Sequence, residues 1–259
     1  MPVLMRPWGH MHFRVRGPQG GVPVVFLNSL GTDLRMWDAV VDRLPGLRAV
    51  GLDKPGHGLS ATPSGDWSLA DLAADAVALM DHLGIARAVV AGCSIGGMIG
   101  QMLGARHPDR VRGLVLSNTA MKVGTAESWA ARIEGVRSLG MAGLAQQVIE
   151  RWFAAPFRAT DEVLPWVTML ARGDAAGYAG TCRVLAAADL TGESPRIACP
   201  VLLIGGSADL STPVDLVRAT AAAIPGARVE VIEGSGHIPA IDNPDRTAAL
   251  IGGFVEGLA

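Results

Sequence analysis

Short runs of consecutive apolar residues alternate along the chain with longer segments whose apolar positions recur at helical spacing. The runs predict strands over residues 22–27, 47–52, 88–92, 114–117, 201–205 and 229–232. Continuous apolar runs are typical of strands buried on both faces of a parallel sheet. Helical patterns cover residues 68–83, 95–106, 215–223 and 243–255. We therefore predict an α/β fold with a mostly parallel, doubly wound sheet, to which residues 10–16 add an antiparallel strand at the edge.

The alternation stops between residues 121 and about 196, where helical periodicity continues without a convincing strand. Three of the six tryptophans, Trp129, Trp152 and Trp166, lie in this region. We predict that residues 121–196 form a helical cap, inserted after one strand. Residues 1–120 and 197–259 would then form the core.

Residues 88–105 carry no charge, and Arg87 and Arg106 flank them. This length is close to the lower limit for a membrane span, and the glycines in it recur every fourth residue. We favour a short buried strand followed by a turn into a helix, because Ser94 and Gln101 lower the hydropathy. We also see no signal peptide, since the first fifteen residues contain no continuous apolar segment.

Composition excludes several classes of function. Hydrophobic residues make up 49% of the chain and charged residues 18%, which indicates a large core rather than disorder. The formal net charge of −2 argues against a nucleic-acid partner. Cys93, Cys182 and Cys199 match no metal or redox spacing, so we expect no disulfide framework and a cytoplasmic protein.

The sequence Gly92-Cys93-Ser94-Ile95-Gly96 fits the pattern G-x-S-x-G between a predicted strand and a predicted helix. In that context the turn lifts the serine hydroxyl above the strand ends, beside a helix N-terminus that favours negative charge. The turn is so tight that the flanking positions need glycine. Cys93 is a weaker nucleophile candidate, because it would need small residues at positions 91 and 95, and Ile95 is large. We predict Ser94 as the nucleophile.

A serine nucleophile needs a base and a carboxylate that orients the base. Asp209 follows the predicted strand 201–205, and His237 follows the strand 229–232. Both therefore lie at the strand ends where ligands bind in open α/β sheets, in the order serine, acid, histidine. Asp215 competes with Asp209, but it falls in the first turn of a helix, where a carboxylate has a structural role. His57, just after another strand, we interpret as structural.

An oxyanion hole needs two backbone N–H groups. We expect one from Ile95, the residue after the nucleophile. The other should come from the loop after the strand 22–27, where Leu30 is our choice. These groups complete the predicted machinery of a serine hydrolase.

The chain resembles the α/β-hydrolases along nearly its whole length. The segments that carry the resemblance are Leu27-Asn28-Ser29-Leu30-Gly31-Thr32-Asp33, Asp53-Lys54-Pro55-Gly56-His57-Gly58-Leu59-Ser60, Gly92-Cys93-Ser94-Ile95-Gly96-Gly97-Met98-Ile99-Gly100-Gln101 and Gly234-Ser235-Gly236-His237. Most members carry His-Gly where this chain has Asn28-Ser29. That feature, with the segment after Ser94, is similar to the 3-oxoadipate enol-lactonases of aromatic-compound degradation.

The resemblance implies an enzyme that opens 3-oxoadipate enol-lactone to 3-oxoadipate through an acyl-enzyme, without a cofactor or metal. The substrate would be a small carboxylated lactone. Arg132 in the cap is the candidate for its carboxylate, with Arg137, Arg151 and Arg172 as competitors. Trp129 and Trp152 are expected to wall the pocket.

Three alternatives stay open. A generic carboxylesterase and a carbon–carbon bond hydrolase of the same fold would use the same triad. A catalytically silent receptor or scaffold of this fold commonly lacks a triad member, whereas this chain has all three. The sequence leaves the oligomeric state open.

Overall fold

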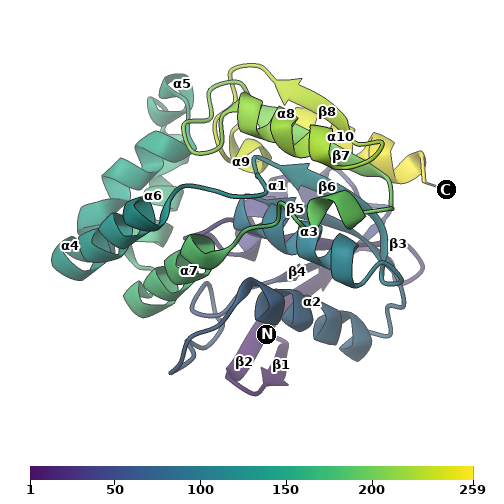
Figure 1. The fold of residues 1–259 in the computed structure, drawn as a ribbon, viewed down its shortest axis with the longest axis horizontal. Helices are drawn as coiled ribbons and strands as arrows, with labels where there is room; N and C mark the ends of the chain where they lie inside the picture. The colour runs from purple at the N-terminus through teal and green to yellow at the C-terminus, as the bar shows by residue number, and fades with distance from the viewer. Residues whose placement is uncertain (259) are drawn as a thin grey trace.

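The computed structural model describes residues 1–258, and an eight-stranded sheet lies at its centre (Figure 1). In space the strands follow the order β1-β2-β4-β3-β5-β6-β7-β8. Their bounds are β1 Val3–Arg6, β2 Gly9–Arg16, β3 Val22–Leu27, β4 Leu47–Leu52, β5 Ala88–Cys93, β6 Val111–Ser117, β7 Val201–Gly206 and β8 Arg228–Ile232. The pairs β1–β2 and β2–β4 are antiparallel, and all other neighbouring pairs are parallel. The predicted α/β fold with a mostly parallel sheet is confirmed.

Two strands differ from the prediction by more than one residue. β1 lies outside β2, so the antiparallel strand predicted at the edge is the second strand of the sheet. The sequence did not predict β1, because its four residues alternate between exposed and half-buried positions. β6 begins at Val111, three residues earlier than predicted. Arg112 and Gly113 interrupt the apolar run, but Val111 and Gly113 both pair with β5, and the register shifts at the unpaired Arg112 between them.

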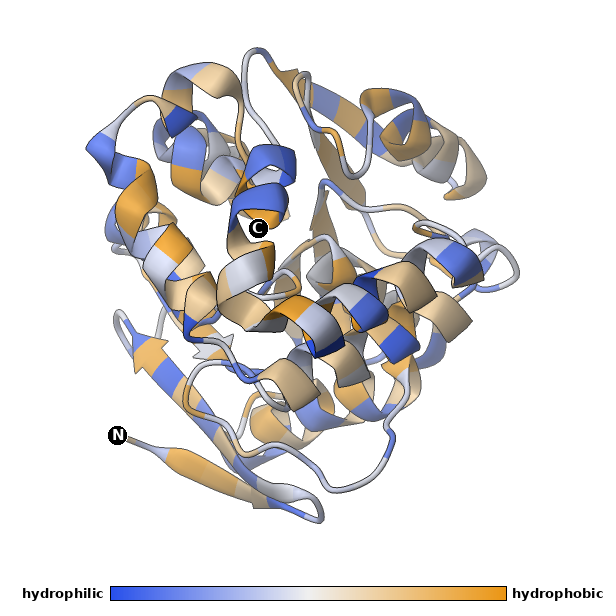
Figure 2. Ribbon diagram, turned by 90° about the vertical axis from the view of Figure 1, so that its left-hand side faces the viewer, coloured by the Kyte–Doolittle hydropathy of each residue, from blue (hydrophilic) through white to orange (hydrophobic). Residues whose placement is uncertain are grey.

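The central strands are apolar because helices cover both faces of the sheet. Every residue of β5 and of β7 is buried. Figure 2 shows hydrophobic strands in the interior and helices striped with hydrophobic and hydrophilic residues. The helices of the core are α1 Asp38–Asp42, α2 Leu69–His82, α3 Ile95–Arg106, α8 Val214–Ala223, α9 Pro239–Asp242 and α10 Pro244–Glu256. α2 packs against α3, and α1 packs against α10.

Helices alone occupy the described chain between β6 and β7. They are α4 Ala126–Trp152, α5 Ala155–Arg158, α6 Leu164–Ala171 and α7 Ala175–Ala187, with short 3-10 turns between them. These four helices gather to one side of the sheet in Figure 1. α4 bends at Gly140, whose φ of 66° is left-handed, and packs against α6 and α7. The helical cap inserted after one strand is confirmed, while its division from the core at residues 121 and 196 stays a prediction.

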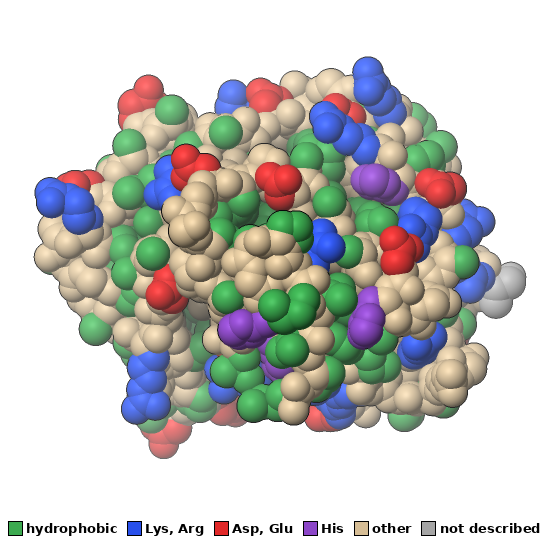
Figure 3. Space-filling view, turned by 90° about the horizontal axis from the view of Figure 1, so that it is seen from below, with side chains coloured by type: hydrophobic (Ala, Val, Ile, Leu, Met, Phe, Trp, Pro, Cys, Tyr) green, Lys and Arg blue, Asp and Glu red, His purple; other side chains and the backbone are tan. Residues whose placement is uncertain are grey.

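The uncharged stretch 88–105 divides into strand β5 and helix α3, as predicted. None of the helices within residues 1–258 combines the length and the apolar character that a membrane span requires. On the face drawn in Figure 3, basic and acidic side chains are interspersed. Neither sign of charge dominates that face.

Candidate active site

Ser94 occupies a sharp turn between β5 and α3. Its φ of 58° and ψ of −119° lie outside the regions that ordinary residues adopt, which costs about 1–3 kcal/mol. The surrounding structure holds this conformation. The Ser94 amide donates to the Ser117 carbonyl at 2.9 Å, and the Ser94 carbonyl accepts from the Thr119 hydroxyl at 2.7 Å.

The two flanking glycines are required by close approach. A Cβ atom on Gly92 would lie 2.2 Å from the Gly96 carbonyl oxygen. A Cβ atom on Gly96 would lie 2.2 Å from the carbonyl oxygen of Leu27, at the end of β3. Real Cβ contacts do not come this close, so neither position accepts a side chain without backbone movement. The two glycines of the G-x-S-x-G pattern are therefore required by the tightness of the turn and by its packing against β3.

Asp209 and His237 come together at the carboxyl ends of β7 and β8. The Nδ1 atom of His237 lies 2.9 Å from Asp209 Oδ2, and both side chains are buried. The His237 amide donates to the Trp152 carbonyl at 2.7 Å, which ties this loop to the end of cap helix α4. His237 and Ser94 line the same cavity. The arrangement is that expected of a triad, and the catalytic roles of the three residues stay predictions.

The surroundings of Asp209 keep it ionised. Burial acts to raise the pKa of Asp209, but the charge and hydrogen bond of His237, with hydrogen bonds from Thr212 and Asn118, outweigh it. These contacts hold the pKa of Asp209 below its usual range. An ionised Asp209 accepts a hydrogen bond from the Nδ1–H group, so the Nε2 atom of His237 carries the free lone pair that a general base needs.

Sequence reasoning missed two residues that hold Asp209. The Asn118 Nδ2 group donates to Asp209 Oδ2 at 2.8 Å and to the Gly236 carbonyl at 3.1 Å. The Thr212 hydroxyl donates to Asp209 Oδ2 at 2.6 Å, and the Thr212 amide donates to Oδ1 at 3.1 Å. Asn118 directly follows β6, and a polar residue at the carboxyl end of a buried strand was a signal that could have identified it.

Two backbone amides near Ser94 are available to an oxyanion. Ile95 is the first residue of α3, and Leu30 lies in the loop after β3. Within residues 1–258, neither amide has a hydrogen-bond acceptor. The N-terminus of α3 also favours negative charge. The geometry supports the predicted oxyanion hole without testing it.

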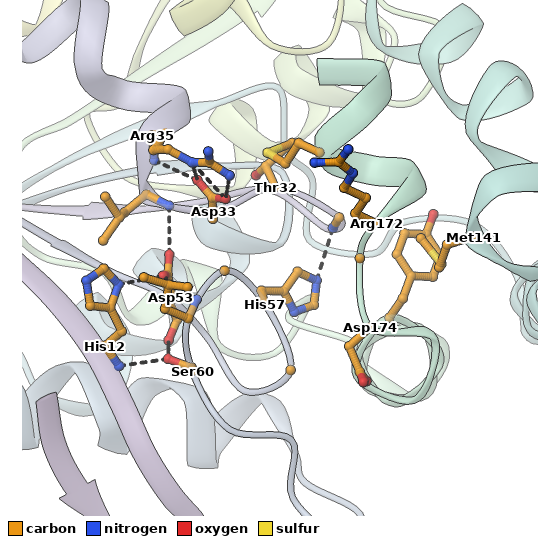
Figure 4. A pocket seen from close by; sticks show the side chains of 18 of the residues that line it. His12, Thr32, Asp33, Arg35, Asp53, His57, Ser60, Met141, Arg172 and Asp174 are labelled. Atoms are coloured by element: carbon orange, nitrogen blue, oxygen red, sulfur yellow. Dashed lines mark hydrogen bonds and ion pairs between the residues drawn. The ribbon is translucent and has the colours of Figure 1, made fainter. Parts of the chain in front are cut away.

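His57 holds the oxyanion loop. Its Nε2 atom accepts from the Gly31 amide at 3.1 Å (Figure 4), and its Nδ1 atom lies 3.0 Å from the Pro55 carbonyl. Burial, with the nearby charge of Lys54, keeps the pKa of His57 well below its usual value. A neutral ring with the proton on Nδ1 satisfies both contacts. These contacts fit the structural role predicted from the sequence.

The cavity above Ser94 has a volume of about 150 Å³. The cap contributes two arginines to its lining, Arg132 and Arg151, and also both of the predicted tryptophans, Trp129 and Trp152. Within residues 1–258, neither Arg132 nor Arg151 forms an ion pair, but the Arg151 guanidinium donates to the Leu210 carbonyl at 3.1 Å. A cation without a carboxylate partner beside the cavity suits an anionic substrate.

The other competing residues are less suitable. Arg137 pairs with Glu134 on the exposed face of α4, and Arg172 lines a larger second cavity of about 1190 Å³ (Figure 4). Asp215 is exposed and lies beside Arg218 in the first turn of α8. Cys93 is buried, and burial raises the pKa of its thiol well above the usual value, so it is a poor nucleophile.

Comparison with known proteins gives a consistent result. The family profile described as the alpha/beta hydrolase fold matches residues 22–244. A protein of Acinetobacter baylyi named 3-oxoadipate enol-lactonase 2 is 38% identical over 85% of this chain and 84% of its own length. A second protein of that organism, named 3-oxoadipate enol-lactonase 1, is 34% identical over 95% of this chain and 92% of its own.

Solved structures agree with these sequence matches. The crystal structure of an enol-lactonase from Burkholderia xenovorans has a TM-score of 0.95 and 36% identity, and the match covers 98% of this chain and 100% of the other. A thermophilic esterase from Thermogutta terrifontis, described with malate bound, has a TM-score of 0.90 and 27% identity. It covers 96% of this chain and 94% of the other.

Proposed function

The chain belongs to the α/β-hydrolase family and is a hydrolase, and from this we propose that it opens a small lactone that carries a carboxylate. The proposed substrate is 3-oxoadipate enol-lactone, and the product is 3-oxoadipate. The observation that carries this proposal is Arg132, a cation without an ion-pair partner in the described chain, in the cavity that Ser94 and His237 also line. The names of the two Acinetobacter relatives and of the Burkholderia structure support it.

The proposed reaction begins at Ser94. His237 takes the Ser94 proton at Nε2, and the Ser94 oxygen attacks the lactone carbonyl. The Leu30 and Ile95 amides donate to the oxyanion that forms. The ring carbon–oxygen bond then breaks, and the released enol oxygen takes the proton from His237.

Ring opening distinguishes a lactone from an ester at the next step. The leaving enol stays attached to the acyl group, so the intermediate on Ser94 contains every atom of the substrate. Water, deprotonated by His237, attacks this acyl-enzyme, and the proton returns to Ser94 as the product leaves. The enol ketonises to the 3-oxo acid. No step in this sequence requires a metal or a cofactor.

Recognition of the substrate carboxylate is the role proposed for Arg132. A guanidinium can hold a carboxylate through two parallel hydrogen bonds. Arg151 lines the same cavity and is the second candidate for this role. Trp129 and Trp152 are proposed to wall the site. The Trp129 ring is already fixed, because its Nε1 group donates to the Val123 carbonyl at 2.6 Å.

A carboxylesterase is the second candidate function. A pimeloyl-[acyl-carrier protein] methyl ester esterase of Chromobacterium violaceum is 32% identical over 85% of this chain and 88% of its own length. The predicted triad would serve an open-chain ester equally well. Arg132 is the feature that favours a carboxylated substrate over an uncharged one.

Parallel hydrolysis assays separate the two candidates. We expect 3-oxoadipate enol-lactone to have a kcat/KM at least about 100-fold above that of p-nitrophenyl acetate, because it can engage the cavity arginine. Equal values, or a preference for the uncharged ester, would refute the lactonase proposal.

We further propose a cytoplasmic location, since all three cysteines are free thiols.

A further inference from the structure

The buried Lys54 side chain is not explained by the roles assigned so far. The chain has two lysines, and Lys122 is exposed while Lys54 is only 1% exposed. Burial of an ammonium group is costly unless the group is paired or hydrogen-bonded. Within residues 1–258, Lys54 forms no ion pair. The oxygens of the neighbouring Asp53 are occupied by His12 (Figure 4) and by the backbone amides of Leu34 and Leu59.

The acceptors of the Lys54 ammonium are two backbone carbonyls of the oxyanion loop. Its Nζ atom donates to the Ser29 carbonyl at 2.5 Å and to the Thr32 carbonyl at 3.2 Å. The Ser29 carbonyl also accepts from the Thr32 hydroxyl at 2.9 Å and from the Thr32 amide at 3.3 Å. Lys54 therefore bridges the two ends of a tight turn whose third residue, Gly31, has a φ of 77°.

The Ser29 carbonyl and the Leu30 amide belong to one peptide group. No peptide bond within residues 1–258 is cis, so these two groups point in opposite directions along a planar unit. A Ser29 carbonyl directed at Lys54 therefore directs the Leu30 N–H away from Lys54. Leu30 lines the cavity with Ser94, and its amide has no other acceptor within residues 1–258.

We propose that Lys54 is a positioning residue, which fixes the Ser29–Leu30 peptide so that the Leu30 amide faces the oxyanion formed when Ser94 attacks. This inference rests on the proposed function, since it assigns a support to the predicted oxyanion hole. If the peptide rotated by half a turn, the Ser29 carbonyl would face the developing negative charge and repel it. Lys54 opposes this rotation, because the rotated peptide would leave the buried amine without its shortest hydrogen bond.

The positioning role does not depend on the charge of Lys54. Burial lowers the pKa of Lys54 to about 7, although Asp53 and Asp33 act in the opposite direction. A neutral amine still has two N–H groups, which suffice for the two carbonyls. The ammonium form adds polarisation of the peptide, which strengthens the Leu30 N–H as a donor.

Replacement of Lys54 by Met tests the inference. Met has a similar length and removes the donor, while the Thr32 hydroxyl and amide still bond to the Ser29 carbonyl. We expect a kcat about 10- to 100-fold lower, less than the ~10²- to 10³-fold cost of losing an oxyanion donor outright. We expect KM to stay within twofold, and both the enol-lactone and p-nitrophenyl acetate to lose the same fraction of kcat. Lys122→Met, on the surface, is the matched control and should leave kcat unchanged.

The labelling rate of Ser94 by a fluorophosphonate gives an independent readout, and it should fall in parallel with kcat. A Lys54→Met protein with kcat and labelling rate within twofold of the wild type would overturn the inference. The inference would also be overturned if KM rose by the same factor as kcat fell and the melting temperature dropped. That pattern indicates a general structural role. If Lys54→Met does not fold, Lys54→Leu, whose side chain also has no hydrogen-bond donor, supplies the same comparison. The ester and labelling measurements remain decisive even if the enol-lactone is not a substrate, so the two proposals fail separately.

Discussion

Replacement of Asp209 by Asn tests how the predicted triad works. Asp209 accepts five hydrogen bonds: Oδ2 from His237, Thr212 and Asn118, and Oδ1 from the amides of Ser211 and Thr212. An asparagine has one acceptor oxygen, which can serve the two amides. Its NH₂ group would then face three groups that now donate. His237 can satisfy that NH₂ group only by moving its own proton from Nδ1 to Nε2.

This change of tautomer removes the lone pair that must accept the Ser94 proton. We therefore expect kcat to fall by about 10⁴-fold, the loss known when a triad carboxylate is replaced by its amide without loss of geometry. The loss of one acceptor in a buried site should also lower the free energy of unfolding by about 1–3 kcal/mol. Hydrolysis of p-nitrophenyl acetate measures kcat, and urea unfolding measures stability.

The stability difference should depend on pH with a definite sign. The pKa of Asp209 in the folded protein lies below its usual range, so its contribution to stability is complete above the unfolded pKa of about 3.9. That contribution is lost as the pH falls through the folded value. The difference in unfolding free energy between wild type and Asp209→Asn should therefore narrow in strong acid.

The kcat prediction has its own test. An Asp209→Asn protein that keeps more than a tenth of the wild-type kcat would refute the proposed change of tautomer.

Three further predictions follow from the cavity and the turn. Arg132→Met should raise KM for the carboxylated lactone by about 10- to 100-fold and leave p-nitrophenyl acetate unaffected, whereas Arg137→Met should change neither; equal effects on both substrates would contradict the carboxylate role. Gly96→Ala should lower the melting temperature and kcat together, because its Cβ atom would lie 2.2 Å from a carbonyl oxygen of β3; an unchanged melting temperature would show that the turn tolerates a side chain. Asn118→Ala should cost about 1–3 kcal/mol in urea unfolding and lower kcat less than Asp209→Asn does; the opposite order would assign Asn118 the larger role.

The fold could be predicted where burial of a strand produces a continuous apolar run in the sequence. The strands 22–27 and 47–52 match the structure at both ends, because their apolar runs face helices on both sides. The helix predicted over residues 68–83 is α2, and in the structure it begins with a capping box between Ser68 and Asp71. β1 lacks such a signal, because a short exposed strand has little apolar periodicity.

The candidate site could be predicted only as far as the order of elements determines it. Strand ends meet at one edge of a parallel sheet, so Asp209 and His237 could be paired from their positions along the chain. The contacts of Asn118 and of Lys54 depend on strand register and on the path of a loop, which no local pattern encodes. Which of the α4 arginines line the cavity likewise depends on how that helix is turned about its axis.

Rapid-quench mass spectrometry with enzyme in excess over 3-oxoadipate enol-lactone tests the central claim most directly. The predicted result is a transient adduct on the peptide that contains Ser94, with a mass increase equal to the whole lactone, and no adduct or turnover in Ser94→Ala. A Ser94→Ala protein that still opens the lactone, or turnover without any adduct on Ser94 at any quench time, would contradict the account.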